Sequence, residues 1–219
     1  LARNRMRYLV NDMGWEKFRN LVLKERAIVK STQSVIVKLN IDESINEIQR
    51  PISVSNESAS VPDGFARWQK PNVEEQSQGG FNSVFIGLES GDITANQLRS
   101  VAEIIRDYSA EGFARNGFSQ NIVIRYVHDD DLKSMYSKLL ETGLAKTGSL
   151  TMASAVGCSG TTSCNLALTN SHRLAKEVQR KFLELKLDED DDLKDSTIKI
   201  SGCPNSCGQH EVATIGFYG

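Results

Sequence analysis

Cysteine is the residue type whose spacing in this chain points most directly to chemistry. The 219-residue sequence has four cysteines, and all of them lie in its last third. Five residues separate Cys158 from Cys164, and three separate Cys203 from Cys207. Closely spaced thiols can form disulfides, and as thiolates they bind zinc or iron–sulfur clusters. The pattern therefore predicts one sulfur-rich site near the end of the sequence.

Disulfides, a zinc site and an iron–sulfur cluster are the three kinds of cysteine site to compare with this spacing. Disulfide frameworks are typical of small, loop-rich secreted proteins, and we do not expect this chain to be secreted. Structural zinc prefers gaps of about two to four residues, so the wider gap after Cys158 disfavours zinc. Four thiolates around an iron–sulfur cluster accommodate both gaps. Four unrelated buried cysteines would leave the composition of the surrounding turns unexplained.

The turns around both cysteine pairs contain residues that suit a bulky inorganic group. Gly157 and Gly160 flank the first pair, and Gly202, Pro204 and Gly208 flank the second. Glycine lets the backbone approach a cluster closely, and proline fixes a turn. Backbone N–H groups and the neighbouring serine and threonine hydroxyls can donate to sulfur, which tunes the potential of a cluster.

The flanking residues make the pattern specific. The segment Ser201-Gly-Cys-Pro-Asn-Ser-Cys-Gly-Gln-His210, followed by Ile215-Gly-Phe217, resembles the cluster motif of the nitrite and sulfite reductases. The first pair, followed by Asn165-Leu-Ala167, resembles that family as well. Its members couple a [4Fe–4S] cluster to siroheme, a heme, and reduce sulfite to sulfide or nitrite to ammonia with six electrons. The chain is thus similar to a middle-to-C-terminal fragment of such an oxidoreductase.

The resemblance implies particular ligands. It assigns the [4Fe–4S] cluster to Cys158, Cys164, Cys203 and Cys207, with Cys207 as the bridge to the siroheme iron. It places Asn205 beside the macrocycle. It also implies a small anion, sulfite or nitrite, as substrate, and an electron donor such as ferredoxin or a flavoprotein. A truncated chain can lack the siroheme, and residue types alone do not separate sulfite from nitrite.

A second motif of the resembling family contributes contacts to siroheme. The carboxylates of siroheme need arginine and amide groups as hydrogen-bond donors. The family pattern Arg-x-Thr-x-x-Gln-Asn is matched here by Arg115, Gln120 and Asn121. These three residues are therefore candidate cofactor contacts. Gly117 stands where the family has threonine, so one hydroxyl contact is missing from this chain.

Composition excludes several classes of partner. Lysine and arginine number 26 against 28 aspartates and glutamates, a net charge of −2. A nucleic-acid binder is usually basic, so we expect no nucleic acid partner. No run of 18 apolar residues occurs, so we expect no membrane span. We expect a cytoplasmic protein.

The elements that must position these residues predict a mixed α/β (α+β) fold. Residues 84–88 and 122–126 are expected strands, each followed by a helix, the first capped by Thr94 and the second opened by Asp129–Asp131. This order suits a ferredoxin-like half domain. The expected buried face of the first helix consists of Leu98, Val101, Ile104 and Ile105.

The cysteine-bearing part is expected to be the start of a cluster-binding α/β domain. We predict a strand at residues 150–153 and a helix from Cys164 to about Leu187. A solvated acidic loop at 188–192, a strand at 197–200 and another beginning at Val212 complete this part. The expected buried side of the helix consists of Leu166, Leu174, Val178, Phe182 and Leu185.

These elements suggest a division of the chain. Residues 1–30 form the helical end of a preceding cluster-type domain, and 31–78 form a connector with a short strand near 35–37. Residues 79–147 form the half domain, and 148–219 form the truncated [4Fe–4S]/siroheme-binding domain. The resemblance places the anion-binding residues upstream of Leu1, so we expect this chain alone to be inactive.

Three other functions remain open on the sequence alone. One is a [4Fe–4S] electron-transfer protein without siroheme, which would lack the Soret and red absorption bands of that heme. Another is a structural zinc or metal-free module. The third is a reductase-like enzyme of corrin biosynthesis, which residues upstream of Leu1 would distinguish.

Overall fold

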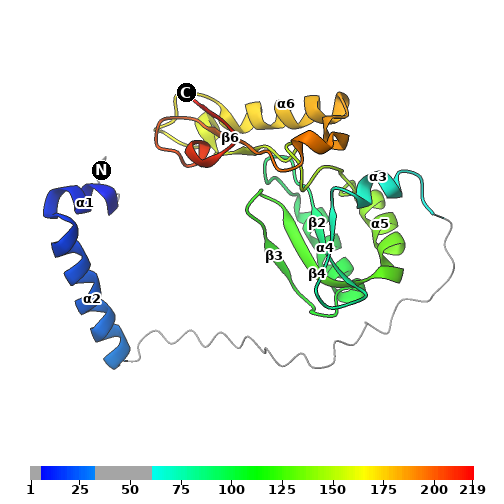
Figure 1. The fold of residues 1–219 in the computed structure, drawn as a ribbon, viewed down its shortest axis with the longest axis horizontal. Helices are drawn as coiled ribbons and strands as arrows, with labels where there is room; N and C mark the ends of the chain where they lie inside the picture. The colour runs from blue at the N-terminus through cyan, green and yellow to red at the C-terminus, as the bar shows by residue number, and fades with distance from the viewer. Residues whose placement is uncertain (1–5, 33–60) are drawn as a thin grey trace. The chain divides into compact units, whose positions relative to one another are not determined.

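The structure is a computed structural model, and it describes residues 6–32 and 61–219. The chain divides into two compact units, residues 1–46 and 47–219, which are treated separately here (Figure 1). The strand predicted near residues 35–37 and most of the expected connector lie outside the described residues.

The first unit contains two helices, α1 (Met6–Met13) and α2 (Trp15–Thr32). We expected one helical stretch over residues 3–30. Gly14 interrupts it, because its φ of +81° is left-handed, a conformation that commonly ends a helix. A hydrogen bond from the Gly14 N–H to the Val10 oxygen at 2.8 Å closes the last turn of α1.

The second unit begins with an antiparallel sheet in the order β1-β2-β4-β3. Its strands are β1 (Val73–Glu75), β2 (Phe81–Ile86), β3 (Ala114–Asn116) and β4 (Ile122–His128). Burial alternates along β2 and β4, so one face of the sheet carries the core. Helices α4 (Ala95–Tyr108) and α5 (Leu132–Glu141) contribute to that same core. The expected β-α-β-α order is confirmed; we call residues 61–147 the half domain.

The half domain extends into the range expected for the connector. Helix α3 (Phe65–Gln69) precedes β1, which pairs with β2. Trp68 is almost completely buried, and its ring lies 5.0 Å from that of Tyr136 on α5. Phe65 contacts both rings. Residues 65–75 therefore contribute to the sheet and the core.

Both helix starts predicted in the half domain are found. Thr94 caps α4 in a reciprocal capping box with Gln97. A single 3-10 turn, η1 (Asp129–Asp131), leads into α5. The buried face of α4 differs from the expectation at one position: Leu98 is 52% exposed, because the side facing the sheet runs through Val101, Ile104 and Tyr108.

Residues 148–219, called here the cysteine segment, form a parallel sheet in the order β5-β6-β7. The strands are β5 (Val156–Gly157), β6 (Ile198–Ser201) and β7 (Ile215–Tyr218), and helix α6 (Ser171–Glu184) packs on the first two. Figure 1 shows α6 (orange) running along this segment beside the half domain. The strands expected at 197–200 and near the end of the chain are present as β6 and β7.

Two expectations for the cysteine segment are wrong. Residues 150–153 form turns, and the strand lies later, at β5. Helix α6 begins at Ser171, because the Asn170 side chain accepts the Arg173 N–H and caps it there. Its buried side is made of Ser171, Ala175 and Gln179 with Val178 and Phe182 partly buried, whereas Leu166, Leu174 and Leu185 are exposed.

The acidic run is also not a fully solvated loop. It contains two 3-10 turns, η3 (Leu187–Glu189) and η4 (Asp191–Leu193). The carboxylate of Asp188 is completely buried and pairs with Arg67 of the half domain at 3.2 Å. This buried charge is retained because it has that partner.

No helix in the described part of the chain is long and apolar enough to cross a membrane.

Candidate metal centre at the cysteine loops

The two cysteine loops begin at the same edge of the parallel sheet. Cys158 directly follows β5, and its N–H donates to the Ile200 oxygen on β6 at 3.1 Å. Cys203 follows β6 by two residues. Parallel neighbouring strands end at one edge, so β5 and β6 bring cysteines that lie 45 positions apart in the sequence to one place.

Glycines let the two loops touch. The Gly202 carbonyl accepts hydrogen bonds from the N–H groups of Leu168 at 2.7 Å and Thr169 at 3.2 Å. A Cβ added to Gly202 would lie 2.9 Å from the Cα of Gly160. A larger residue at Gly202 would therefore push the loops apart. The glycines were expected to let the backbone approach a cluster, and the contact between the two loops is an additional finding.

The sulfur of Cys158 lies among hydrogen-bond donors. The Gly202 N–H donates to it at 3.2 Å, and the hydroxyl of Ser171 lies 3.1 Å away. Burial raises the pKa of the Cys158 thiol, but hydrogen bonds from Ser171, Gly202 and Gly160 outweigh burial and lower that pKa. The thiolate is the form that binds metal, so these donors favour ligation.

The second loop is closed by polar contacts of its own. The Asn205 amide donates to the Cys203 sulfur at 3.3 Å. The Ser201 hydroxyl oxygen accepts the Gly208 N–H at 3.0 Å and lies 2.8 Å from Nδ1 of His210. A Cβ on Gly208 would lie 2.1 Å from the Ile200 oxygen. Glycine is therefore required beside Cys207.

The donor chemistry suits a cluster. All four cysteines are thiols: Cys158 and Cys164 are half-buried, Cys203 is buried and Cys207 is exposed. Within the described ranges, no three histidine, cysteine or acidic side chains are arranged to hold a single metal ion. In a [4Fe–4S] cluster each thiolate binds a different iron, so the sulfur atoms need not converge on one point. Adjacent glycine-rich loops with sulfur-directed donors fit such a group.

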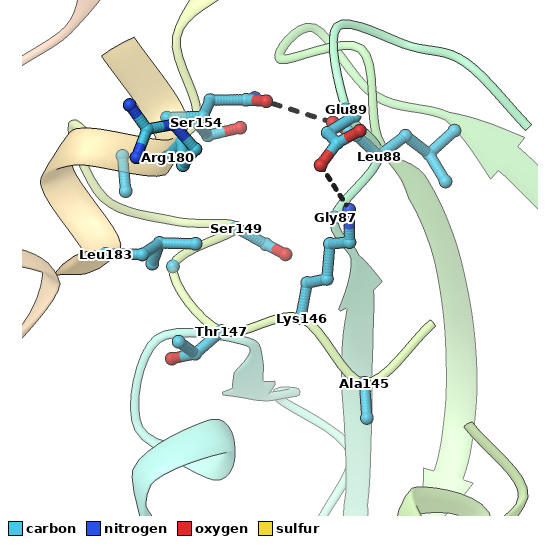
Figure 2. Close-up of a pocket in the computed structure, with 13 residues that line it drawn as sticks. Gly87, Leu88, Glu89, Ala145, Lys146, Thr147, Ser149, Ser154, Arg180 and Leu183 are labelled. Atoms are coloured by element: carbon cyan, nitrogen blue, oxygen red, sulfur yellow. Dashed lines mark hydrogen bonds and ion pairs between the residues drawn. The ribbon is translucent and has the colours of Figure 1, made fainter. Parts of the chain in front are cut away.

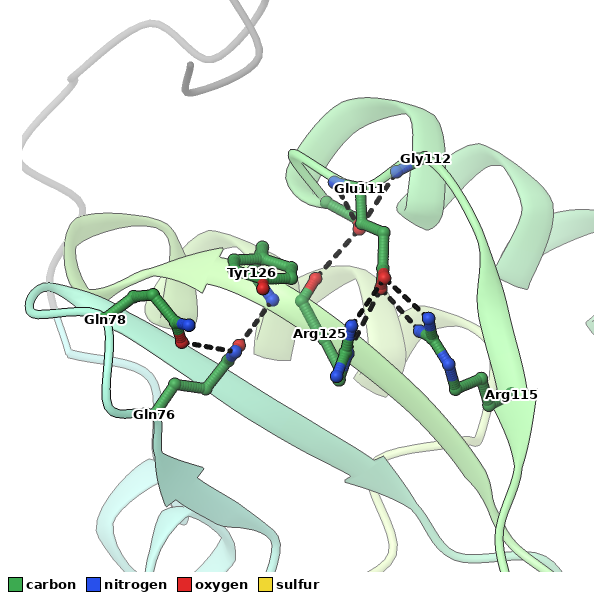
Figure 3. A network of polar contacts seen from close by, with 8 residues as sticks. Gln76, Gln78, Glu111, Gly112, Arg115, Arg125 and Tyr126 are labelled. Carbon is green, nitrogen blue, oxygen red and sulfur yellow. Dashed lines mark hydrogen bonds and ion pairs between the residues drawn. The ribbon is translucent and has the colours of Figure 1, made fainter. Parts of the chain in front are cut away.

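Arg115, a candidate siroheme contact, belongs to an ion-pair network in the half domain (Figure 3). Its guanidinium binds both carboxylate oxygens of Glu111, at 2.5 and 2.6 Å, and lies 4.5 Å from the centre of the Phe113 ring. Arg125 donates to the same carboxylate at 2.7 Å. Burial raises the pKa of Glu111, but the two arginines outweigh it, and the pKa is lowered.

Gln120 and Asn121 point in different directions. The Gln120 amide reaches the cysteine segment: its Nε2 donates to the Gly157 oxygen at 2.9 Å, and its Oε1 accepts the Gly157 N–H at 3.3 Å. Asn121 is buried in the half domain, and its Oδ1 has no hydrogen-bond partner among the described residues. A Cβ on Gly117 would lie 1.9 Å from that oxygen. The glycine that departs from the family pattern is therefore the residue that fits here.

Comparison with known proteins identifies the lineage. Residues 74–142 match the family model described as the nitrite/sulfite reductase ferredoxin-like half domain. Ferredoxin–nitrite reductase of Synechococcus elongatus is 30% identical over 165 residues, which cover 74% of this chain and 31% of the relative. This chain belongs to the nitrite/sulfite reductase family. Sulfite reductase (ferredoxin) 1 of Mycolicibacterium paratuberculosis is 26% identical over 225 residues, which cover 100% of this chain and 35% of the relative.

A solved structure supports the fold of this family member. The NirA protein of Mycobacterium tuberculosis superposes with a TM-score of 0.56 at 22% identity, covering 100% of this chain and 35% of NirA. The chain thus spans about a third of the length of these relatives. The expected fold, a ferredoxin-like half domain followed by the α/β segment that carries the cysteines, is confirmed.

A cavity of about 380 Å³ lies between the half domain and α6 of this reductase-family chain (Figure 2). Lys146 and Glu89 face each other across a 2.8 Å ion pair at its wall, and Arg180 and Leu183 reach it from α6. The cavity is not lined by any of the four cysteines, so it is separate from the candidate metal centre.

Sequence reasoning missed Ser171 as part of the site. It is buried at the first position of α6 and touches Cys158 twice, through its sulfur and, at 2.9 Å, through its carbonyl oxygen. The local signal was present, because Asn170 is a strong helix cap. Placing the helix start there would have put Ser171 at the end of the first cysteine loop.

Proposed function

We propose that this chain is the cluster- and siroheme-binding part of a nitrite or sulfite reductase. One observation carries the proposal: β5 and β6 bring the two cysteine loops together, and the Gly202 N–H of one loop donates to the Cys158 sulfur of the other at 3.2 Å. In this proposal Cys158, Cys164, Cys203 and Cys207 hold a [4Fe–4S] cluster. When bound, siroheme would supply the iron site, and the cluster would pass on the electrons that an external donor provides for a six-electron reduction.

The chain's own residues hold and tune these groups. Ser171 and Gly202 stabilise the Cys158 thiolate by hydrogen bonds. The exposed position of Cys207 suits a thiolate shared between cluster and siroheme iron. Asn205, which donates to the Cys203 sulfur, is the proposed neighbour of the macrocycle.

Arg115 and Asn121 are the proposed siroheme contacts in the half domain. The Arg115 side chain is 40% exposed, although Glu111 occupies its forked edge. A guanidinium in this state can still meet a second carboxylate through its remaining donors. Asn121 would contribute the N–H donors of its side-chain amide, since its oxygen, which has no partner among the described residues, can only accept. Gln120 matches the same motif and is treated separately below.

Substrate and electron donor follow from the relatives. The curated proteins named above are a ferredoxin–nitrite reductase and a ferredoxin sulfite reductase, which supports nitrite or sulfite as substrate and ferredoxin as donor. We further propose a division of the chain into residues 1–30, a connector that ends where the half domain (61–147) begins, and residues 148–219, and we propose a cytoplasmic location.

Anaerobic reconstitution of the chain with iron and sulfide tests the ligand assignment. The wild-type chain is expected to bind about four irons and four sulfides, as a cluster with four thiolate ligands requires. Cys158→Ser and Cys203→Ser should lose most of that iron, because serine is a poor ligand for iron–sulfur clusters. Ser163→Ala, an exposed position between the first two cysteines, is the control and should bind normally. Full iron retention by Cys158→Ser would contradict the assignment.

Absorption spectroscopy of the anaerobically purified full-length protein tests the siroheme. A Soret band and a red band are expected in addition to the broad shoulder of the cluster. A spectrum with the shoulder alone would favour an electron-transfer protein that holds only a cluster. Cys207→Ser should alter the heme bands, since this thiolate is the proposed bridge.

A further inference from the structure

Gln120 is bound to the strand that delivers the first cysteine. Its side-chain amide both donates to and accepts from the backbone of Gly157, at 2.9 and 3.3 Å. On the other edge of the strand, Gly157 is in register with Ile200 of β6, and the next N–H, of Cys158, donates to the Ile200 oxygen. Successive backbone groups of a strand point to opposite edges. The Gln120 amide thus takes the place of a neighbouring strand on β5.

The half domain holds this amide in a defined position. Gln120 has a φ of +56° and lies in the turn between β3 and β4. In this turn the Gly117 N–H donates to the backbone carbonyl oxygen of Asn121 at 2.9 Å. A Cβ added to Gly91, which has a φ of +81°, would lie 3.3 Å from the Cβ of Gln120. The side chain therefore leaves a closed turn and passes a glycine that makes room for it.

Small residues pack against the other side of Gly157. A Cβ on Gly157 would lie 2.9 Å from both the Ala175 Cβ and the Ser171 oxygen of α6. β5 is therefore enclosed by β6, α6 and the Gln120 amide. Of these three contacts, only Gln120 comes from the half domain, so it links that domain directly to the residue before Cys158.

We propose that Gln120 is a positioning residue for the Cys158 thiolate. It fixes the backbone of Gly157, and through it the direction in which Cys158 presents its sulfur to the cluster. This role rests on the proposed function of Cys158 as a ligand. It differs from the siroheme contact that the family motif implies, because the amide group binds the cysteine segment.

Gln120→Met tests this role, since methionine keeps the length of glutamine and removes both polar groups. Gln76→Met is the matched control, because the Gln76 amide also binds backbone, the Tyr126 N–H at 2.7 Å, but in the half domain. The first measurement is amide hydrogen exchange in the metal-free chain. The Gly157 N–H loses its acceptor in Gln120→Met, so its exchange is expected to speed up about five- to tenfold. Gln76→Met should leave exchange at Gly157 unchanged.

The second measurement uses the reconstituted cluster. The EPR spectrum and midpoint potential of the reduced cluster should change in Gln120→Met and not in Gln76→Met, because hydrogen bonding and geometry around a ligand sulfur tune both. Gln120→Leu, which also removes both polar groups and adds no charge, serves if the methionine variant does not fold, and it should change the same properties.

The outcomes separate two kinds of failure. Unchanged exchange at Gly157 would overturn the inference even if the wild-type chain binds its cluster. Faster exchange with an unaltered EPR spectrum and potential would also overturn it, by reducing Gln120 to a structural contact. Failure of the wild-type chain to bind iron would remove the ligand role of Cys158, and with it the proposed function.

Discussion

Glu111 shows how a single residue determines what its neighbours can do. Its carboxylate is 4% exposed and binds the guanidinium groups of Arg115 and Arg125, which are 40% and 37% exposed. Figure 3 shows the two arginines converging on it from β3 and β4. A motif match assigned Arg115 to a cofactor, whereas the structure shows that its nearest anion is within the half domain. Arg115 can bind both Glu111 and a cofactor carboxylate only if the cofactor meets the guanidinium N–H groups that do not already donate to Glu111.

Glu111→Gln should lower the free energy of unfolding by about 2 kcal/mol at neutral pH, since two partly exposed cations lose a buried partner. The pKa of Glu111 lies below its ordinary value of 4.5. Its contribution is therefore fully present above that value and is lost as the pH falls through the lower pKa of the folded state. Denaturant unfolding at neutral and acidic pH measures this.

The variant should also lose less stability on acidification than the wild-type chain does. Glu184→Gln is the control, because that carboxylate forms exposed pairs with Arg180 and Lys181 and should change little. Equal effects of the two variants at neutral pH would show that burial of Glu111 is unimportant.

Two helices illustrate what local sequence decides about elements. Helix α4 begins at the predicted Thr94, because a threonine followed three residues later by glutamine forms a capping box within one turn. Helix α6 begins later than predicted, and its buried side carries Ser171 and Ala175 in place of the expected leucines. The reason is close packing, since Gly157 on β5 approaches the helix backbone too closely for larger side chains.

Thr94→Ala should destabilise the half domain by about 1 kcal/mol, because the Gln97 N–H loses its side-chain acceptor. Thermal or chemical unfolding measures the loss. Thr94→Ser keeps the hydroxyl and should retain most of the stability. If serine and alanine have the same effect, the cap contributes nothing and packing alone sets the start of α4.

Contacts distant in sequence join the half domain to the cysteine segment. Arg67 near the start of the half domain binds Asp188 after α6, and Lys176 on α6 binds Asp92 at 2.6 Å. Together with the link from Gln120 to Gly157, these contacts fix the cysteine loops relative to the ferredoxin-like sheet. These contacts therefore connect the half domain directly to the segment that carries the candidate metal centre.

Asp188→Asn should weaken this junction by about 1–3 kcal/mol, because the buried carboxylate also accepts from Thr147 at 3.3 Å and its loss removes the partner of Arg67. Hydrogen exchange in residues 65–70 and 187–193 should rise together. Asp191→Asn, which affects the exposed pair with Lys70, should leave both unchanged. A similar effect of both substitutions would mean that the junction does not depend on the buried pair.

The sequence by itself determined the family, the cysteine ligands as candidates and most elements of the half domain. These features are carried by short-range signals: cysteine spacing, the alternation of β2 and β4, the cap of α4 and the acidic residues before α5. The ligand assignment itself remains a prediction. The start of α6 could also have been predicted, because Asn170 is a local helix-capping signal. The spacing of the leucines was given more weight, and it placed the start too early.

Only the tertiary structure decided where side chains from distant segments meet. Asp188 reads as part of a solvated acidic run, yet its partner Arg67 lies 121 positions away and allows it to be buried. Gln120 reads as a cofactor contact, yet its amide pairs with Gly157, 37 positions away. In each case a partner brought close by folding sets the role of the residue, and no local pattern encodes such a contact.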